Sequence, residues 1–531
     1  MDYLWAKDDT SSEYVDYFAA VKESHRDVFN EWDQLLSGNL MWLNKYEQFS
    51  KNNETSTEYL IEGHRKFSVD NWSGAMLSYN KSLCFAEPGS VNESLAYVNR
   101  SECFFKMEMY TKSFIDIKMA IKWKHSSRVT KRLKRLHDKC LKFLWLGFGI
   151  DCPMPKLSFD PDDNFPCMAD VLEIRENDEF GRHIVAKCDI DAGKEVLVTN
   201  VFASGTAVGN QLCCRNCNKI EQNFVPCRKC VGTVFCYGSC SEHKAIHQLE
   251  CRSFFHVIGD TTLKLPIQTT LMAIEMFPSV DHLMEFVEQT RRANRIPTST
   301  KNSTSRYALF LNLSPFLNEE RIYPAYQAYT SLMSIAQVKR LFDTERKRRF
   351  LMHLTLHHLM VIPQNSFRHE RFHRDWILTD YIYDVLSLIN HSCVPNVFNY
   401  STSDEVGHCV TVRPIRKGEQ IFINYLGNEC KESLEYRRKA LKTWDFECKC
   451  PKCVFQSSPN KLSRDDRKKI TSNASWKFIA ENCQKSHCKE SNSDLRIRPK
   501  LKKECVNFLQ KFGHLVLTPE IRFVKHCFTL H

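Results

Sequence analysis

The first part of the chain has the hydrophobic pattern of α-helices. Between residues 14 and 145, apolar side chains recur every three or four positions and prolines are few, which matches the period of an amphipathic helix. Two segments of this stretch are alike at an offset of 38 residues, with small side chains at two matching points and large hydrophobic ones at the other two: Gly63, Trp72, Ala75 and Tyr79, then Ser101, Tyr110, Ser113 and Ile117. The pattern predicts an N-terminal helical region over residues 1–57 and paired, closely packed helices over residues 58–145.

The paired helices resemble two tetratricopeptide repeats, whose usual period is ~34 residues. A plain helical bundle is the alternative, because two repeats are few for a solenoid. If the resemblance holds, this region would bind chaperone tails or other peptides in a concave groove.

After residue 151 the pattern changes. Residues 152–166 are rich in Pro, Asp and Phe and are typical of a linker. Residues 184–199 alternate apolar and polar side chains around Asp191-Ala192-Gly193, which predicts a hairpin of short strands. Helices are predicted over residues 263–291 and, after a polar loop at 298–304, up to about residue 358. Short strands are then predicted from 359 to 425, before a basic, helical C-terminal stretch.

Composition is that of a globular protein. The 531 residues are 43% hydrophobic and 26% charged, and no run approaches eighteen apolar residues, so no membrane association is expected. The chain starts without the basic and apolar segments of a secretory signal. We therefore interpret the 24 cysteines as reduced thiols and metal ligands rather than disulfides, in a protein of the cytoplasm and nucleus that is expected to be a monomer.

The net charge of +11 comes from 74 basic and 63 acidic residues. Basic residues are spread along the chain, with local clusters at residues 131–135 and 346–349. These clusters are either solvated helix faces or surfaces for nuclear import or an anionic partner. Direct binding to nucleic acid is not expected, because the cysteine-rich segment at residues 214–251 lacks an obvious base-reading helix with Arg, Asn or Gln at regular spacing.

Eight metal-type ligands lie within thirty-eight residues. They form three close cysteine pairs and a final His-x3-Cys pair: Cys214, Cys217, Cys227, Cys230, Cys236, Cys240, His247 and Cys251. A structural zinc ion takes four sulfur or imidazole ligands, so the set supplies two zinc sites. Buried or disulfide-bonded cysteines are the alternative interpretation. Cys213 and His243 lie nearby but do not fit the paired spacing.

This order of ligands resembles a MYND finger. The resemblance implies that the two sites interleave, with Cys214, Cys217, Cys236 and Cys240 on one zinc and Cys227, Cys230, His247 and Cys251 on the other. It also implies a possible role in binding proline-containing peptides.

A second group of motifs follows. The segment NHSCVPN occupies residues 390–396 and GEQIFINY occupies residues 418–425, and they are followed by Phe446, Cys448, Cys450 and Cys453. In this order they resemble the SET domain of protein lysine methyltransferases. With the inserted finger, the chain resembles the SET and MYND domain family, and the N-terminal helices make it most similar to the tetratricopeptide-bearing member of that family.

The resemblance implies an α+β multidomain fold, in which a split, β-rich SET domain carries the MYND zinc finger and a helical insert between flanking helical regions. The expected boundaries are 170–205 for the first part of the SET domain, 214–251 for the finger, 260–350 for the helical insert, 351–428 for the main SET part, 429–455 for a post-SET zinc segment and 456–531 for the C-terminal helices.

The resemblance also implies a third zinc site. The three late cysteines leave a tetrahedral ion one ligand short, and the family supplies the missing thiolate from the motif cysteine. The expected ligands are Cys393, Cys448, Cys450 and Cys453. A free, buried Cys393 is the alternative.

The implied activity is methyl transfer from S-adenosylmethionine to a lysine of a histone or another protein. The enzyme must align the reactants, desolvate the amine and surround the reacting centre with aromatic walls. Tyr425 is the expected catalytic residue of the transfer pore. The expected cofactor-binding residues are Gly181, Arg182, His183, Asn365, Asn390, His391, Tyr425 and Phe446.

Two positions depart from the family pattern. His183 stands where a second glycine is usual, so one backbone position loses the freedom to adopt φ > 0. Trp444 stands where some active relatives have a second pore tyrosine, which replaces a phenol with an indole donor. The alternative function is therefore an adaptor with a weakly active SET domain that recruits protein partners, such as a transcriptional corepressor.

Overall fold

The computed structural model describes most of the chain: residues 50–123, 126–148, 155–206, 213–217, 219–220, 222–242, 245–251, 261–316, 321–373, 375–401, 406–427, 433–454, 463–483, 494–515 and 518–530. The region predicted over residues 1–57 lies outside the described residues except at its end.

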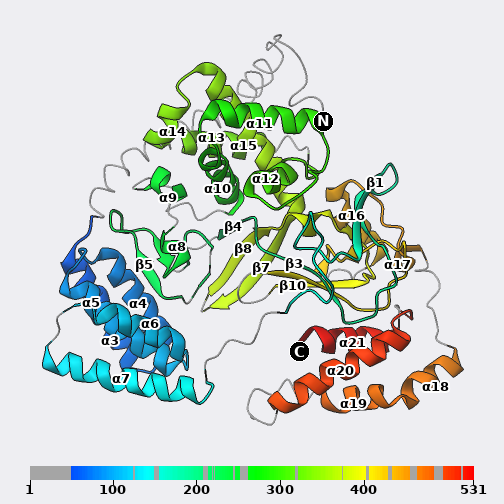
Figure 1. The fold of residues 1–531 in the computed structure, drawn as a ribbon, viewed down its shortest axis with the longest axis horizontal. Helices are drawn as coiled ribbons and strands as arrows, with labels where there is room; N and C mark the ends of the chain where they lie inside the picture. Colours follow the sequence, from blue (N-terminus) through cyan, green and yellow to red (C-terminus); the bar gives the residue numbers. More distant parts are fainter. Residues whose placement is uncertain are drawn as a thin grey trace.

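Residues 50–148 form the N-terminal helical unit, in which each helix packs against the next along the chain (Figure 1). Side-chain caps begin these helices: the Asn52 side chain accepts from the Glu54 N–H, and the Ser90 hydroxyl accepts from the Glu93 N–H. The helices are α3 (Asn53–Ser68), α4 (Trp72–Phe85), α5 (Val91–Lys106), α6 (Tyr110–Ala120) and α7 (Ser127–Trp145).

Small residues make the contacts within the two helix pairs, as the 38-residue offset predicts. A Cβ atom on Gly63 would lie 2.3 Å from Cε1 of Tyr79, so the α3–α4 pair requires glycine there. At the corresponding place in the α5–α6 pair, the Ser113 hydroxyl donates to the Ser101 carbonyl at 2.8 Å. The helical prediction is confirmed for this unit, while its assignment to tetratricopeptide repeats stays a prediction.

A buried ion pair joins this unit to the finger (residues 213–251). Arg100 and Asp116 are both fully buried, and the guanidinium Nε donates to Asp116 at 2.7 Å. The same guanidinium donates to the Phe224 carbonyl at 2.9 Å, and the Asn223 side chain donates to Asp116 at 2.7 Å. Cys84 and Phe85 add apolar contact with the finger core. The finger therefore has one face packed against the N-terminal unit.

The finger has little regular structure of its own. Its elements are β5 (Phe224–Pro226), β6 (Val234–Cys236), α8 (Ser239–Glu242) and α9 (Ala245–Glu250). The two strands pair antiparallel, in the register Val225 to Phe235. Such short elements cannot bury enough apolar surface to be stable alone, so cross-linking by other means is required.

The central domain combines short strands before the finger with strands after a helical insert. Its strands are β1 (Leu172–Asn177), β2 (Gly181–Ala186), β3 (Glu195–Thr199), β4 (Ala203–Thr206), β7 (Ser366–His373), β8 (Asp375–Ile382), β9 (Asn390–His391), β10 (Val397–Ser401), β11 (Gly407–Thr411) and β12 (Phe422–Ile423). They pair in the orders β1-β2, β10-β11-β3, β4-β8-β7 and β12-β9. Strands that the finger and the insert separate in sequence are thus neighbours in one domain.

The insert is helical and covers one side of these sheets (Figure 1). Its helices are α10 (Thr261–Met276), α11 (Val280–Ala293), α12 (Ser303–Leu311), α13 (Ile322–Ser334), α14 (Ala336–Leu341) and α15 (Glu345–Asn365). The expected change to strands at residue 359 is wrong by one helical turn or more, because α15 continues through Pro363 to Asn365. The 3₁₀ turn η4 (Val385–Leu388) lies between β8 and β9. The domain ends with α16 (Leu434–Leu441), the 3₁₀ turn η6 (Lys442–Trp444) and α17 (Pro451–Val454).

The predicted hairpin over residues 184–199 is wrong. Strand β2 pairs with the preceding β1, whereas β3 pairs with the distant β11. An alternating pattern indicates an extended segment with one buried face, but it does not identify the partner strand. Residues 155–166 are irregular, as a linker predicts, yet Leu157, Phe159 and Phe165 pack against the central core.

The C-terminal helical unit packs on the central domain at the turn 191–193. Its helices are α18 (Arg464–Ser472), α19 (Ala474–Asn482), α20 (Asp494–Phe512) and α21 (Pro519–Leu530). Gln510 accepts a hydrogen bond from the Ala192 N–H at 2.7 Å, and the Lys525 ammonium donates to the Pro395 carbonyl at 3.3 Å. The helical prediction for this unit is confirmed.

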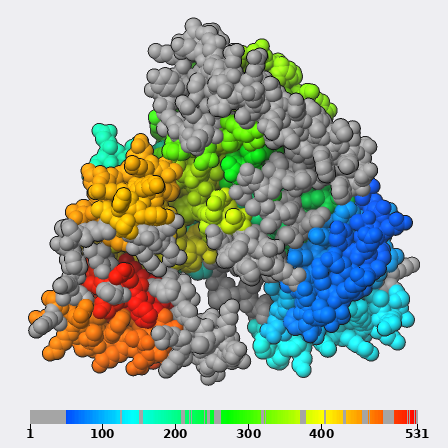
Figure 2. Space-filling model, turned by 180° about the vertical axis from the view of Figure 1, so that it is seen from behind, coloured from blue at the N-terminus to red at the C-terminus, as the bar shows by residue number. Residues whose placement is uncertain are grey.

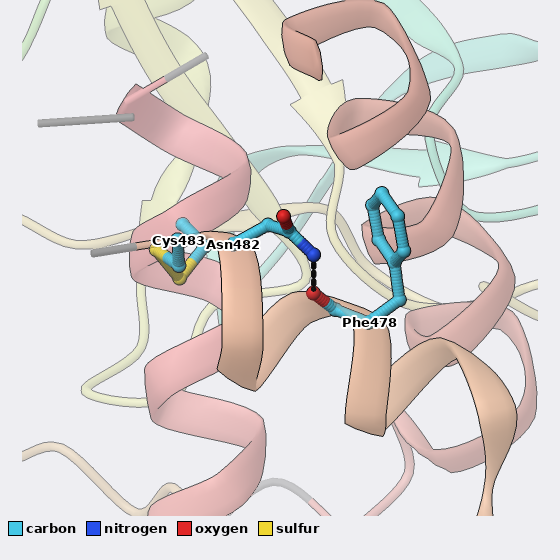
Figure 3. Close-up of a disulfide and its surroundings, with 4 residues drawn as sticks. Phe478, Asn482 and Cys483 are labelled. Carbon is cyan, nitrogen blue, oxygen red and sulfur yellow. Dashed lines mark hydrogen bonds between the residues drawn. A yellow bond between two sulfur atoms is a disulfide. The ribbon is translucent and has the colours of Figure 1, made fainter. Parts of the chain in front are cut away.

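One cysteine pair contradicts the expectation of reduced thiols throughout. Cys483, at the end of α19, forms a disulfide with Cys527 of α21. Figure 3 shows the turn that carries Cys483, where the Asn482 side chain donates to the Phe478 carbonyl at 2.8 Å. The two cysteines are 44 residues apart, so no local spacing signals the bond. None of the helices in the described part of the chain is long and apolar enough to cross a bilayer.

Burial of histidines in α15 makes the fold sensitive to acid. His357 is fully buried, and burial together with the nearby Arg291 cation lowers its pKa to about 3. Since the unfolded pKa is about 6.5, the unfolded state binds a proton that the folded state does not as pH falls from 6.5 toward 3. The stability that neutral His357 contributes is complete above pH 6.5 and is lost as the pH falls from 6.5 toward 3.

We predict that His357→Gln, which keeps a donor for the Leu311 carbonyl, weakens this acid sensitivity. The loss of unfolding free energy between pH 7.5 and pH 5 should be about 2 kcal/mol smaller in the variant. Urea unfolding at the two pH values measures it. Equal losses in both proteins would contradict the assignment of a neutral, buried His357.

Candidate functional site

The centre of the site is a crossing of two chain segments. Strands β9 and β12 run parallel, with Asn390 beside Phe422 and His391 beside Ile423. The Ser392 N–H donates to the Ile423 carbonyl at 2.9 Å and extends the pairing by one residue. Residues 390–396 and 418–425, which the sequence separates, therefore pass side by side.

Asn396 fixes this crossing. Its fully buried side chain accepts from the Phe422 N–H at 2.7 Å and donates to the Gln420 carbonyl at 2.8 Å. An asparagine amide supplies one acceptor and two donors, so it can satisfy both kinds of backbone group at once. The last residue of the NHSCVPN segment thus holds the segment that leads to Tyr425.

His391 links the crossing to Tyr425 and to Cys393. Its Nδ1 accepts from the Tyr425 N–H at 2.9 Å, so the ring proton lies on Nε2, 3.3 Å from the Cys393 sulfur. Burial lowers the pKa of His391 to about 4. The imidazole is therefore neutral near pH 7 and donates toward the sulfur.

Tyr425 is held by its neighbours at both ends. Its hydroxyl donates to the Ile389 carbonyl at 2.7 Å, and its ring lies 5.2 Å from His391 and 5.3 Å from Trp444 between centroids. Burial raises the pKa of the phenol, so it stays protonated at neutral pH. The Trp444 indole N–H in turn donates to the Gln364 carbonyl at 2.9 Å. Both aromatic rings are thus oriented by backbone carbonyls.

A cavity of about 560 Å³ opens on one side of Tyr425. Its wall includes the end of α15, the start of β7, Ile389, Asn424, Tyr425 and Trp444. Of the predicted site residues, Asn365 and Tyr425 line this cavity, whereas the other predicted cofactor residues do not.

Three of the remaining predicted residues, Asn390, His391 and Phe446, lie close together near Tyr425. The Asn390 side chain donates to the Phe180 carbonyl at 2.9 Å, which ties the motif to the β1–β2 turn. The Phe446 ring is 37% exposed and lies 6.0 Å from His391 and 6.5 Å from Tyr425 between centroids. Tyr425 is therefore shared between the cavity and this second group.

The β1–β2 turn shows how His183 is accommodated. Gly181 has φ +58, and a Cβ there would meet nothing within 4 Å. His183 has no positive φ, lies within β2 and is buried, with Nδ1 2.8 Å from the Gly181 carbonyl. Only the first position requires glycine, so the histidine is compatible with the backbone.

Two predicted cofactor residues, Arg182 and Asn365, have side chains that hydrogen-bond to backbone carbonyls. The Arg182 guanidinium donates to the Asn312 carbonyl in the helical insert, and burial lowers its pKa. The Asn365 amide donates to the carbonyls of Ser314 at 2.9 Å and Val361 at 2.7 Å, so it shapes the end of α15. The side chains of Arg182 and Asn365 therefore have structural hydrogen bonds in the protein itself.

The predicted metal ligands come together in three groups. Within each group, the ligand atoms lie within 4.8 Å of one another, and the groups have the predicted membership: Cys214, Cys217, Cys236 and Cys240; Cys227, Cys230, His247 and Cys251; Cys393, Cys448, Cys450 and Cys453. Cys213 is buried outside these groups, and His243 lies outside the described residues.

Polar side chains support two of these groups. His247 has Nε2 3.6 Å from the Cys230 sulfur and Nδ1 3.4 Å from Glu250, which the buried Arg215 holds at 2.8 Å. The Arg437 guanidinium, also fully buried, donates to the Cys453 sulfur at 3.5 Å.

Sequence reasoning missed the groups that orient the aromatic rings. The Ile389 carbonyl is a backbone acceptor, so no residue type indicates it. Gln364 acts through its carbonyl in the same way. Asn396 could have been found, because it is the last residue of the NHSCVPN segment and an asparagine side chain can hydrogen-bond to backbone groups.

Comparison with known proteins agrees with these motifs. Residues 181–426 match the SET domain family. The chain is 21% identical over 521 residues to protein-lysine N-methyltransferase SMYD4 of Danio rerio, covering 78% of this chain and 68% of that protein. It is 22% identical over 601 residues to SMYD4 of Homo sapiens, covering 85% and 74%.

A solved SET domain of LSMT bound to lysine and AdoHcy is 13% identical, with a TM-score of 0.23, and the match covers 48% of this chain and 49% of that one. A similarity of this size carries no structural argument.

We predict that Asn396→Ala destabilises the fold by about 2–4 kcal/mol, since it leaves a buried N–H and a buried carbonyl unpaired. Asn399→Ala, in the neighbouring strand β10, serves as the control and should change stability by less than about 0.5 kcal/mol. Urea unfolding measures both. Similar values for the two variants would show that Asn396 does not hold the crossing.

Proposed function

We propose that this chain, a SET-domain protein of the SMYD family that is most like SMYD4, is a protein-lysine N-methyltransferase that uses S-adenosylmethionine. The similarity to proteins named for this activity supports the proposal. The observation that carries it is the position of Tyr425, which lines a cavity together with Trp444 and also contacts the predicted cofactor residues His391 and Phe446.

The residues around the crossing fit the proposed cofactor. The open surroundings of Gly181 leave backbone accessible at the β1–β2 turn, and the half-exposed Phe446 ring offers a face for an adenine. We assign the holding role to Gly181, Asn390, His391 and Phe446. When bound, S-adenosylmethionine supplies a methyl carbon activated by its sulfonium charge.

On the cavity side, the chain prepares the acceptor amine. The Tyr425 and Trp444 rings form part of the cavity wall, which also carries polar and charged side chains such as Arg368 and Asp380. Desolvation of a lysine amine beside the two rings would disfavour its charged form. Because the Tyr425 hydroxyl donates to Ile389, its oxygen remains able to accept from an amine. Aromatic faces and this oxygen suit a positive charge at the reacting centre.

We predict that Tyr425→Phe lowers methyl transfer to protein substrates by at least about 100-fold, because it removes an oriented oxygen from the reacting centre. Tyr436→Phe, at an exposed position on α16, is the matched control and should retain activity. Transfer of a radiolabelled methyl group measures both. Labelling that survives Tyr425→Phe, in a protein of unchanged circular dichroism, would remove Tyr425 from the mechanism.

We also propose that the three ligand groups each hold a zinc ion, two in a MYND-type finger and one after the SET domain. Closed sets of four ligands are typical of structural zinc. The Arg215–Glu250–His247 chain would orient the imidazole, since ligating histidines commonly donate their other N–H to a carboxylate. Arg437 would offset the negative charge of four thiolates.

The purified protein should therefore contain three zinc ions per chain, one for each ligand group, as measured by inductively coupled plasma mass spectrometry. Cys448→Ser should lose one ion and, because the same segment carries Trp444 and Phe446, also lose methyl transfer. Cys188→Ser alters an exposed cysteine outside the groups and should change neither. A full zinc content in Cys448→Ser would contradict the third site.

A further inference from the structure

Helix α7 carries an unusual concentration of positive charge. Within Ser127–Trp145 there are seven lysines and arginines and one acidic residue, Asp138. All seven basic side chains are exposed: Arg128, Lys131, Arg132, Lys134, Arg135, Lys139 and Lys142. The helix lies along the outer edge of the N-terminal unit in both views (Figure 1, Figure 2).

The inner face of α7 is already used. Leu133 and Cys140 are buried in the core of the N-terminal unit, and Val129 and Leu136 pack against it. At 100° per residue, Lys131 and Lys142 project from the opposite side of the helix. Lys131 and Lys142 therefore face away from the rest of the unit, whereas Arg132 reaches Glu102 of α5.

Most of this charge is not compensated within the described part of the chain. Arg132 pairs with Glu102, whereas the six other basic residues form no ion pair among the described residues. Like charges three or four positions apart repel, as Lys131 and Arg135 do, and each such pair costs a few tenths of a kcal/mol. An anionic partner would relieve this repulsion.

Large apolar side chains are exposed at the end of the same helix. Trp145 is 87% exposed, and Leu141, Leu146 and Phe148 are 44%, 51% and 52% exposed. Tryptophan and arginine are enriched at the energetic centres of protein interfaces. The end of α7 thus combines an apolar anchor with a basic stripe.

We propose that the exposed face of α7 is a docking surface for an acidic segment of a partner protein, whose apolar end receives Trp145. This surface is separate from the proposed methyl-transfer site, and its function does not depend on that activity.

The distribution of apolar residues favours a protein over a membrane. A helix that binds in the plane of a bilayer needs an apolar face along its whole length. In α7 that face is packed against the N-terminal unit, and the exposed apolar residues are confined to one end. A single-stranded nucleic acid is less suited as well, because such partners use aromatic side chains interleaved along a basic groove.

The test uses the full-length, zinc-loaded protein and a fluorescein-labelled helical peptide. The peptide carries glutamates along one face and leucines at one end, and a second peptide replaces each glutamate with glutamine. Fluorescence anisotropy should show binding of the acidic peptide that weakens as salt rises. Binding of the glutamine peptide should be at least about tenfold weaker.

Variants locate the surface. The triple change Lys131→Glu, Arg135→Glu and Lys142→Glu should weaken binding at least about tenfold, and Trp145→Ala should weaken it about tenfold without changing the salt dependence. The control reverses three exposed lysines elsewhere, Lys301→Glu, Lys339→Glu and Lys468→Glu, and should bind as the unchanged protein does. Circular dichroism confirms that the variants fold.

Several outcomes would overturn the proposal. The first is that the acidic peptide does not bind. The second is that the control triple variant weakens peptide binding as much as the α7 triple variant does, which would reflect net charge alone. Tighter binding of α7 to phosphatidylserine vesicles or to a single-stranded RNA, abolished by the same triple variant, would assign the surface to a different partner.

Discussion

The parallel crossing of β9 and β12 is the constraint on which the rest of the site depends. Parallel pairing of two such short strands supplies few ladder hydrogen bonds, so the crossing needs other support. Asn396 satisfies the backbone of the passing segment, and His391 accepts the Tyr425 N–H. Together with the hydrogen bond from the Tyr425 hydroxyl to the Ile389 carbonyl, these contacts keep Tyr425 beside His391.

The same segment connects the crossing to the thiolate group. Cys393 lies two residues from His391, and its partners Cys448, Cys450 and Cys453 belong to the segment that carries Trp444 and Phe446. Trp444 and Phe446 therefore lie against Tyr425 only if the segment that carries these cysteines is held against residues 390–396. A cluster of buried sulfurs near a buried guanidinium is unfavourable unless an ion organises it, which is why we assign it a structural metal.

Much of this arrangement could be predicted from the sequence, for reasons that differ by element. Helices such as α5 can be predicted from the period of their apolar residues and from caps such as Ser90. Metal-ligand groups can be predicted because their ligands are closely spaced in the sequence. The pairing of β3 with β11 could not be predicted, because an alternating strand does not specify its partner. The Ile389 carbonyl and the Cys483–Cys527 bond depend on tertiary proximity and leave no local signal.

The N-terminal unit meets the finger through buried polar contacts. The N-terminal unit is positioned by the buried Arg100–Asp116 pair, whose remaining donors reach Asn80 and the Phe224 carbonyl of the finger. A buried ion pair adds little net stability, because desolvation offsets the attraction, but a misplaced partner would leave a charge unpaired. The pair therefore specifies one orientation of the unit on the finger. Helix α7 lies on the outer edge of that unit (Figure 1), apart from the proposed methyl-transfer site.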